Sequence, residues 1–208
     1  MAKQRHAADA TTLHTGIVIA AHGRHCVVEK PDGTTVICHP RGKKSQSVVG
    51  DRVRWQPTED QGTIEKVDAR RNLFYRQDEI RTKSFAANLD QVLILIAAEP
   101  EFSESQLARA LIAAEAERIA PIIALNKSDL GAPFERAWTR LAPYRRMHYG
   151  VLPLALHPRV AEPGANAFPP AAEVALTPGG ELLAHGGETD RAALQKLLAG
   201  KTTLVLGP

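Results

Sequence analysis

The sequence has few aromatic residues, few cysteines and no long apolar run. Only 5% of its 208 residues are aromatic, and its two cysteines, Cys26 and Cys38, are too few for a disulfide scaffold. No 18 apolar residues follow one another, and the N-terminus MAKQRHAADA lacks the apolar core of a signal peptide. We therefore expect a cytoplasmic protein without a membrane partner, whose cysteines are reduced, half-buried strand residues.

The positive charge is small but unevenly placed. The net charge is +3, yet residues 1–84 hold 15 Lys and Arg against 10 Asp and Glu. Aromatic residues lie among the cations of 70–83, a pattern typical of an RNA-binding surface. The plain alternative is a solvated face with scattered cations. The candidate RNA-binding residues are Arg41, Lys43, Lys44, Arg52, Arg70, Arg71 and Arg76.

Short β-like runs separated by turn signals fill residues 14–70. Five such runs in under 60 residues predict a small β-barrel, either an OB-fold or an SH3-like barrel. Asp32-Gly33 indicates a hairpin; a two-residue loop would place Cys26 and Cys38 on opposite faces, and a three-residue loop would place them side by side. Residues 1–13 are expected to be a disordered tail, and residues 71–88 a basic linker.

Residues 89–208 have the texture of an α/β domain. The apolar runs at 89–97 and 121–125 predict parallel strands, with a helix between them that Ser103 begins. A helix from about Pro133 and a strand at 151–156 follow, and Pro153 predicts that this strand lies at a sheet edge or is bulged.

The remainder of this region combines a loop, a helix and a strand. Residues 157–189 form a Pro/Gly-rich excursion without a sustained period. Asp190 is predicted to cap a helix that ends at Gly200, and the strand TTLVL follows.

The tetrapeptide NKSD, residues 126–129, directly follows the apolar strand PIIAL. Ligands of nucleotide-binding α/β proteins lie beyond the carboxyl ends of the strands. The Asp129 carboxylate can accept hydrogen bonds from N1–H and the exocyclic amine of guanine, whereas adenine offers no donors in that arrangement. Asn126 can link neighbouring loops, and the Lys127 stem can lie along the base. The alternative interpretation is a polar turn after a strand.

NKSD after IIAL resembles the guanine-recognition motif of translation-factor GTPases, in which a GxxxxGK[ST] phosphate loop comes earlier in the chain. Here no such loop lies upstream, and only TTLVL followed by Gly207 and Pro208 resembles its start. This order is the mark of a circularly permuted GTPase. With a small barrel in front, and with the stretches VVGDRVRW, GTIEKVDARRNLFYR and KSFAANLDQVLILIAAEPEFS, the chain resembles the RsgA (YjeQ, EngC) family.

The resemblance implies an OB-fold that contacts ribosomal RNA, followed by a circularly permuted P-loop GTPase domain that is incomplete over 89–208. It implies hydrolysis of GTP with Mg²⁺, stimulated by the small ribosomal subunit, and a monomer with a zinc domain whose ligands lie beyond residue 208. Asn126, Lys127, Ser128 and Asp129 would bind guanine, and Gly207 and Pro208 would begin the phosphate loop. Where the family usually has a hydroxyl-rich turn, this sequence has Ala155-Leu156-His157.

The resemblance also sets an expectation for the chain by itself. The sequence stops before the phosphate-loop lysine, the switch segments and the zinc ligands, so we expect no catalytic or metal-ligating residue in it and no activity alone. Two further hypotheses stay open: a non-catalytic RNA-binding module with a degenerate nucleotide fold, and a structural protein.

Overall fold

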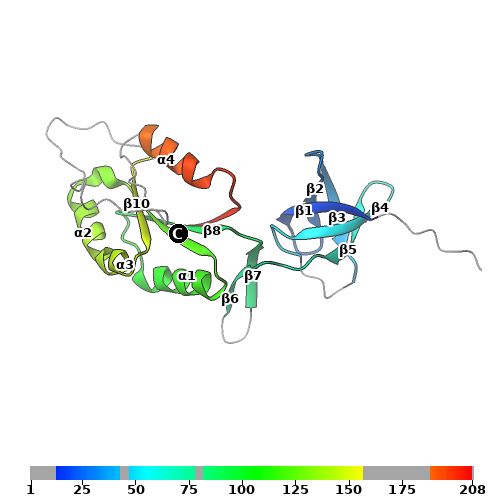
Figure 1. Cartoon of the computed structure of the whole chain (residues 1–208), viewed down its shortest axis with the longest axis horizontal. Helices are drawn as coiled ribbons and strands as arrows, with labels where there is room; N and C mark the ends of the chain where they lie inside the picture. The colour runs from blue at the N-terminus through cyan, green and yellow to red at the C-terminus, as the bar shows by residue number, and fades with distance from the viewer. Residues whose placement is uncertain (1–12, 43–46, 78–81, 157–187, 208) are drawn as a thin grey trace, which may run out of the picture. The chain divides into compact units, whose positions relative to one another are not determined.

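The computed structural model describes residues 13–42, 47–77, 82–156 and 188–207. It divides into two compact units, Met1–Asn88 and Leu89–Pro208, which are described separately below (Figure 1). Several predictions concern residues outside the described ranges: the tail before Leu13, Lys43 and Lys44, Pro208, and the excursion at 157–189 except for its last two residues.

The first unit is built on a closed five-stranded barrel with the strand order β1-β2-β3-β5-β4. The β3–β5 pair is parallel, and all other neighbours in the barrel are antiparallel. This arrangement is the predicted OB-fold. The strands are β1 (His14–Ala21), β2 (Cys26–Glu29), β3 (Thr35–Pro40), β4 (Arg52–Pro57) and β5 (Gly62–Val67).

The two cysteines lie side by side in the barrel core. Lys30 N donates to Thr34 O at 2.8 Å, which leaves a three-residue loop and pairs Cys26 with Cys38 in register. Both thiols are free, but they are buried, not half-buried as predicted. Burial raises the pKa of Cys26 and raises that of Cys38 to about 11. The remaining core residues are Val18, Val28, Val53, Trp55 and Ile64.

The stretch 71–88, expected as a linker, contains a two-stranded antiparallel sheet of β6 (Leu73–Gln77) and β7 (Thr82–Ala87). Aromatic residues favour strands, and Phe74 is buried. Ala87 N donates to Val49 O at 2.9 Å. At Gly50 (φ +87°) a Cβ would lie 2.1 Å from Ala87 O, so glycine allows this close approach. The contacts make this sheet part of the first unit.

The second unit is a parallel sheet with helices on both faces (Figure 1). Its strand order is β10-β9-β8-β11, so β10, which contains Pro153, lies at an edge of the described sheet, as predicted. The strands are β8 (Gln91–Ala97), β9 (Ala120–Asn126), β10 (Gly150–Leu154) and β11 (Thr203–Leu206). The helices are α1 (Glu104–Ala116), α2 (Ala132–Arg140), α3 (Ala142–Arg146), α4 (Glu188–Leu198) and the short 3₁₀ helix η1 (Ser128–Leu130).

Two of the predicted helix ends have different outcomes. The hydroxyl oxygen of Ser103 accepts a hydrogen bond from Gln106 N at 3.4 Å, as expected for the start of α1. By contrast, α4 begins at Glu188, so Asp190 lies inside its first turn, and the predicted cap at Asp190 is wrong. Gly200 follows this helix with φ +68°, as predicted. Within the described ranges, no helix combines the length and apolar character needed to cross a membrane.

Candidate guanine-recognition site

The NKSD motif begins where three neighbouring strands end. Asn126 is the last residue of β9 and pairs in register with Ala97 of β8 and with Leu154 of β10. Because the strands are parallel, their carboxyl ends share one edge of the sheet, where α/β proteins bind ligands. The sheet therefore places the motif at the carboxyl ends of its strands.

The backbone turns sharply at Lys127. This residue has φ 64° and ψ 43°, in the left-handed region, and η1 starts directly after it. Its exposed side chain reaches across to the β8–α1 connection, where Nζ donates a hydrogen bond to Glu99 O. The stem of Lys127 is therefore held across the edge of the sheet, with its apolar carbons available to a flat ligand.

Asn126 joins two loops that follow neighbouring strands. Its Oδ1 accepts a hydrogen bond from Leu156 N at 3.3 Å, in the segment just after β10. The amide side chain thus connects the NKSD turn to the Ala155-Leu156 segment.

Asp129 and Ser128 differ in their environment. Asp129 lies half-buried in η1. Ser128 is only 1% exposed, and its Oγ has no hydrogen-bond partner within the described part of the chain. The hydroxyl of Ser128 is thus turned into the protein, unlike the exposed side chain of Lys127.

Two residues that sequence reasoning did not assign to the site hold the segment after β10. Asp190 Oδ2 accepts from Ala155 N at 2.7 Å, and Arg191 Nη2 donates to Leu156 O at 2.9 Å. The only signal in the sequence was a carboxylate next to an arginine at a predicted helix start. Side chains from α4 thus support a turn that has no hydroxyl of its own at residues 155 and 156.

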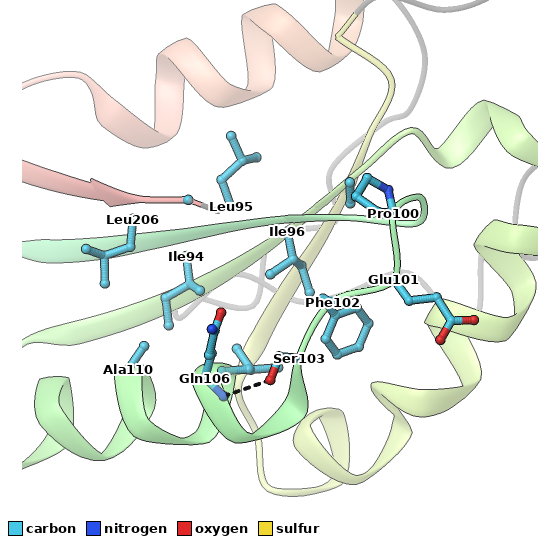
Figure 2. A pocket seen from close by; sticks show the side chains of 13 residues that line it. Ile94, Leu95, Ile96, Pro100, Glu101, Phe102, Ser103, Gln106, Ala110 and Leu206 are labelled. Atoms are coloured by element: carbon cyan, nitrogen blue, oxygen red, sulfur yellow. Dashed lines mark hydrogen bonds between the residues drawn. The ribbon is translucent and has the colours of Figure 1, made fainter.

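A hollow of about 250 Å³ lies beside this edge, between β8, the start of α1 and Leu206-Gly207. Figure 2 shows Ile94, Ile96 and Leu206 lining it, with Gln106 and Ala110 from α1. At Gly207, a Cβ would lie 3.8 Å from Leu95 O. Gly207, the first residue of the predicted phosphate loop, therefore lies beside β8.

The basic candidates all belong to the first unit, but several are engaged in contacts there. Arg70 pairs with buried Asp51, a contact that raises the pKa of the guanidinium. Arg41 pairs with Glu65. Arg71 donates to Asn88 O at 3.0 Å. Arg52 on β4 and Arg76 on β6 are exposed residues. Across the ranges described, no three His, Cys, Asp or Glu side chains gather in a metal-binding group.

Comparison with known proteins gives a consistent result. The RsgA GTPase family model matches residues 67–161. The small ribosomal subunit biogenesis GTPase RsgA of Variovorax paradoxus is 69% identical over 96% of this chain and 54% of its own length. The protein of the same name from Burkholderia pseudomallei strain K96243 is 55% identical over 92% of this chain and 53% of its own length. The chain thus spans about half the length of these curated relatives.

A solved structure shares the fold. The crystal structure of YloQ, a circularly permuted GTPase, matches with a TM-score of 0.57 at 22% identity, over 100% of this chain and 63% of that one. The barrel and the sheet therefore have the fold of an OB domain followed by a circularly permuted GTPase domain. By its sequence, the chain is similar to members of the RsgA family over most of its own length.

Proposed function

We propose that the protein to which these residues contribute is a GTPase that acts in late maturation of the small ribosomal subunit. In this proposal Asn126, Lys127 and Asp129 recognise guanine, and the barrel binds ribosomal RNA. Gly207 and Pro208 begin the loop that holds the phosphates. GTP would be bound with Mg²⁺ in the cytoplasm by a monomer, and a zinc domain would belong to the whole protein.

The observation that carries the proposal is the placement of NKSD at the carboxyl edge of the sheet. Asn126 bonds to Leu156 N there, Lys127 stretches toward Glu99, and Asp129 follows in η1. An ionised carboxylate accepts only, so it matches the paired donors N1–H and the exocyclic amine of guanine. Adenine has no such pair of donors, which would leave the Asp129 carboxylate without partners on the base.

Hydrolysis is proposed for the whole protein, because this chain spans only about half the length of the curated relatives. A suitable protein is a whole-protein chimera, in which this chain is joined to the part of the 69% identical Variovorax relative that the alignment leaves out. We expect the chimera to hydrolyse GTP and not ATP, with a higher rate when small ribosomal subunits are present. Equal turnover of GTP and ATP would contradict the role of Asp129.

A second candidate function is RNA binding by the barrel without any role for a nucleotide. It draws support from the exposed Arg52 and Arg76 side chains of the first unit. The two functions separate in one assay, in which binding of small-subunit RNA to the chimera is measured with GTP, with GDP and without nucleotide. Equal affinity in all three conditions favours the RNA-binding module, and a dependence on the nucleotide favours the GTPase.

A further inference from the structure

Asp190 is a buried carboxylate outside the NKSD motif. It is 1% exposed, and its Oδ2 accepts from Ala155 N at 2.7 Å. A buried carboxylate is costly unless it is hydrogen-bonded, and a bond from a backbone N–H to an ionised oxygen is among the stronger ones. The contact therefore fixes the Ala155 amide firmly against the first turn of α4.

The next residue of α4, Arg191, also holds this segment. Arg191 Nη2 donates to Leu156 O at 2.9 Å. The helix that presents both side chains is itself anchored, because Leu194, Leu197 and Leu198 pack on the sheet. Two consecutive residues of α4 thus hold an N–H and a C=O of two consecutive residues after β10.

These contacts leave one donor of the segment directed at the NKSD motif. With the Ala155 N–H and the Leu156 C=O occupied, the Leu156 N–H points to Asn126 Oδ1 at 3.3 Å. That distance is beyond the usual range for an N–H···O bond, so the bond is weak. A better-placed acceptor on a ligand can share or replace it.

We propose that Asp190 and Arg191 are positioning residues that aim the Leu156 N–H at the six-position oxygen of a guanine base. The inference rests on the proposed function, since it assigns a role in the same base site. It accounts for a turn that lacks hydroxyls at residues 155 and 156, because α4 supplies the groups that hold its backbone. Asp129 then reads the N1–H and amine edge of the base, and the Leu156 N–H reads the oxygen.

The test compares three nucleotides on the whole-protein chimera. GDP carries both the oxygen and the amine, IDP lacks the amine, and 6-thio-GDP replaces the oxygen by sulfur, a weak acceptor. Asp190→Ala is expected to weaken the binding of GDP about five- to tenfold, which corresponds to the loss of one well-placed hydrogen bond. The affinity for 6-thio-GDP should change little. The ratio of the affinities for GDP and 6-thio-GDP should therefore fall toward one, while the ratio of the affinities for GDP and IDP stays unchanged.

Two further variants make the result specific. Asp190→Asn keeps an acceptor oxygen and should restore much of the preference for oxygen over sulfur. Gln195→Ala, on the exposed face of α4, is the matched control and should bind all three nucleotides as the unchanged protein does. If Asp190→Ala does not fold, Arg191→Ala carries the same test, because the Arg191 side chain is exposed.

The outcomes distinguish this inference from the proposed function. Equal binding of GDP and ADP by the unchanged chimera would contradict guanine recognition as a whole. Normal GDP preference, with the oxygen-to-sulfur ratio unaltered in both Asp190→Ala and Arg191→Ala, would overturn the positioning role alone. Amide exchange of Ala155 in the 208-residue chain adds a readout without nucleotide, and it should speed up in Asp190→Ala but not in Gln195→Ala.

Discussion

Arg70 donates to both carboxylate oxygens of Asp51, from Nε at 2.8 Å and from Nη2 at 2.9 Å. Asp51 is fully buried and also accepts from Val48 N at 2.9 Å. Arg70 belongs to the basic stretch that predicted RNA binding, yet its guanidinium neutralises a buried charge. This geometry favours a structural role for Arg70, in joining the barrel to the segment that leads into β6.

Arg70→Met should destabilise the first unit by about 2–4 kcal/mol, since it leaves the buried Asp51 carboxylate without its counter-charge. The measurement is urea unfolding followed by Trp55 fluorescence in a Trp138→Phe background. Arg52→Met, at an exposed side chain of β4, is the control and should change the free energy of unfolding by less than about 0.5 kcal/mol. Equal, small effects of both substitutions would contradict the structural role of Arg70.

Much of the barrel could be predicted from the sequence, but the length of its Asp32-Gly33 loop could not. Short β-branched runs between turn residues indicate strands, and the strands were found. The Asp32-Gly33 signal fits two loop lengths, and only the Lys30–Thr34 hydrogen bond decides between them. The high density of cations in residues 71–88 predicts a basic linker. In the structure, β6 and β7 of this stretch pair as a sheet, and Phe74 is buried.

The buried thiols predict a loss of stability in alkali. The pKa of Cys38 is raised from 9.0 to about 11, so the folded state holds its proton while the unfolded state releases it. The stabilisation is complete below pH 9 and is lost as the pH rises from 9 toward 11, by on the order of 2 kcal/mol. Urea unfolding between about pH 8 and about pH 10.5 measures it. Cys38→Ala should flatten the dependence of the free energy of unfolding on pH. An unchanged dependence in that variant would contradict its assignment to the Cys38 thiol.

Arg52 offers a direct test of RNA binding by the barrel. If Arg52 contacts a phosphate, Arg52→Gln should reduce the slope of log affinity against log salt by about 0.7–0.9, one released counterion. Arg54→Gln on the same strand is the matched control, because Arg54 already pairs with Asp68 at 3.1 Å. The assay is a salt titration of small-subunit RNA binding by the full chain. Identical slopes for both variants and the unchanged chain would exclude Arg52 from the contact.

The candidate site was only partly predictable. NKSD is contiguous and follows a buried strand, so sequence alone locates it at the edge of a sheet. The contact of Asp190 with Ala155 joins residues 35 positions apart, and neither periodicity nor spacing indicates such a pairing. The inward position of Ser128 is also a packing result, since a serine in a polar tetrapeptide gives no sign of its burial.

Guanine recognition by Asp129 is tested most directly by exchanging its carboxylate for an amide. Asp129→Asn presents one acceptor and one donor, which match the N1–H and the two-position oxygen of xanthine instead of the two donors of guanine. In the whole-protein chimera, this variant should bind GDP at least about a hundredfold more weakly and should gain affinity for XDP. Glu135→Gln, at an exposed position of α2, is the control and should leave GDP binding unchanged. Undiminished GDP binding by Asp129→Asn, with no gain for XDP, would contradict the assignment of this site to guanine.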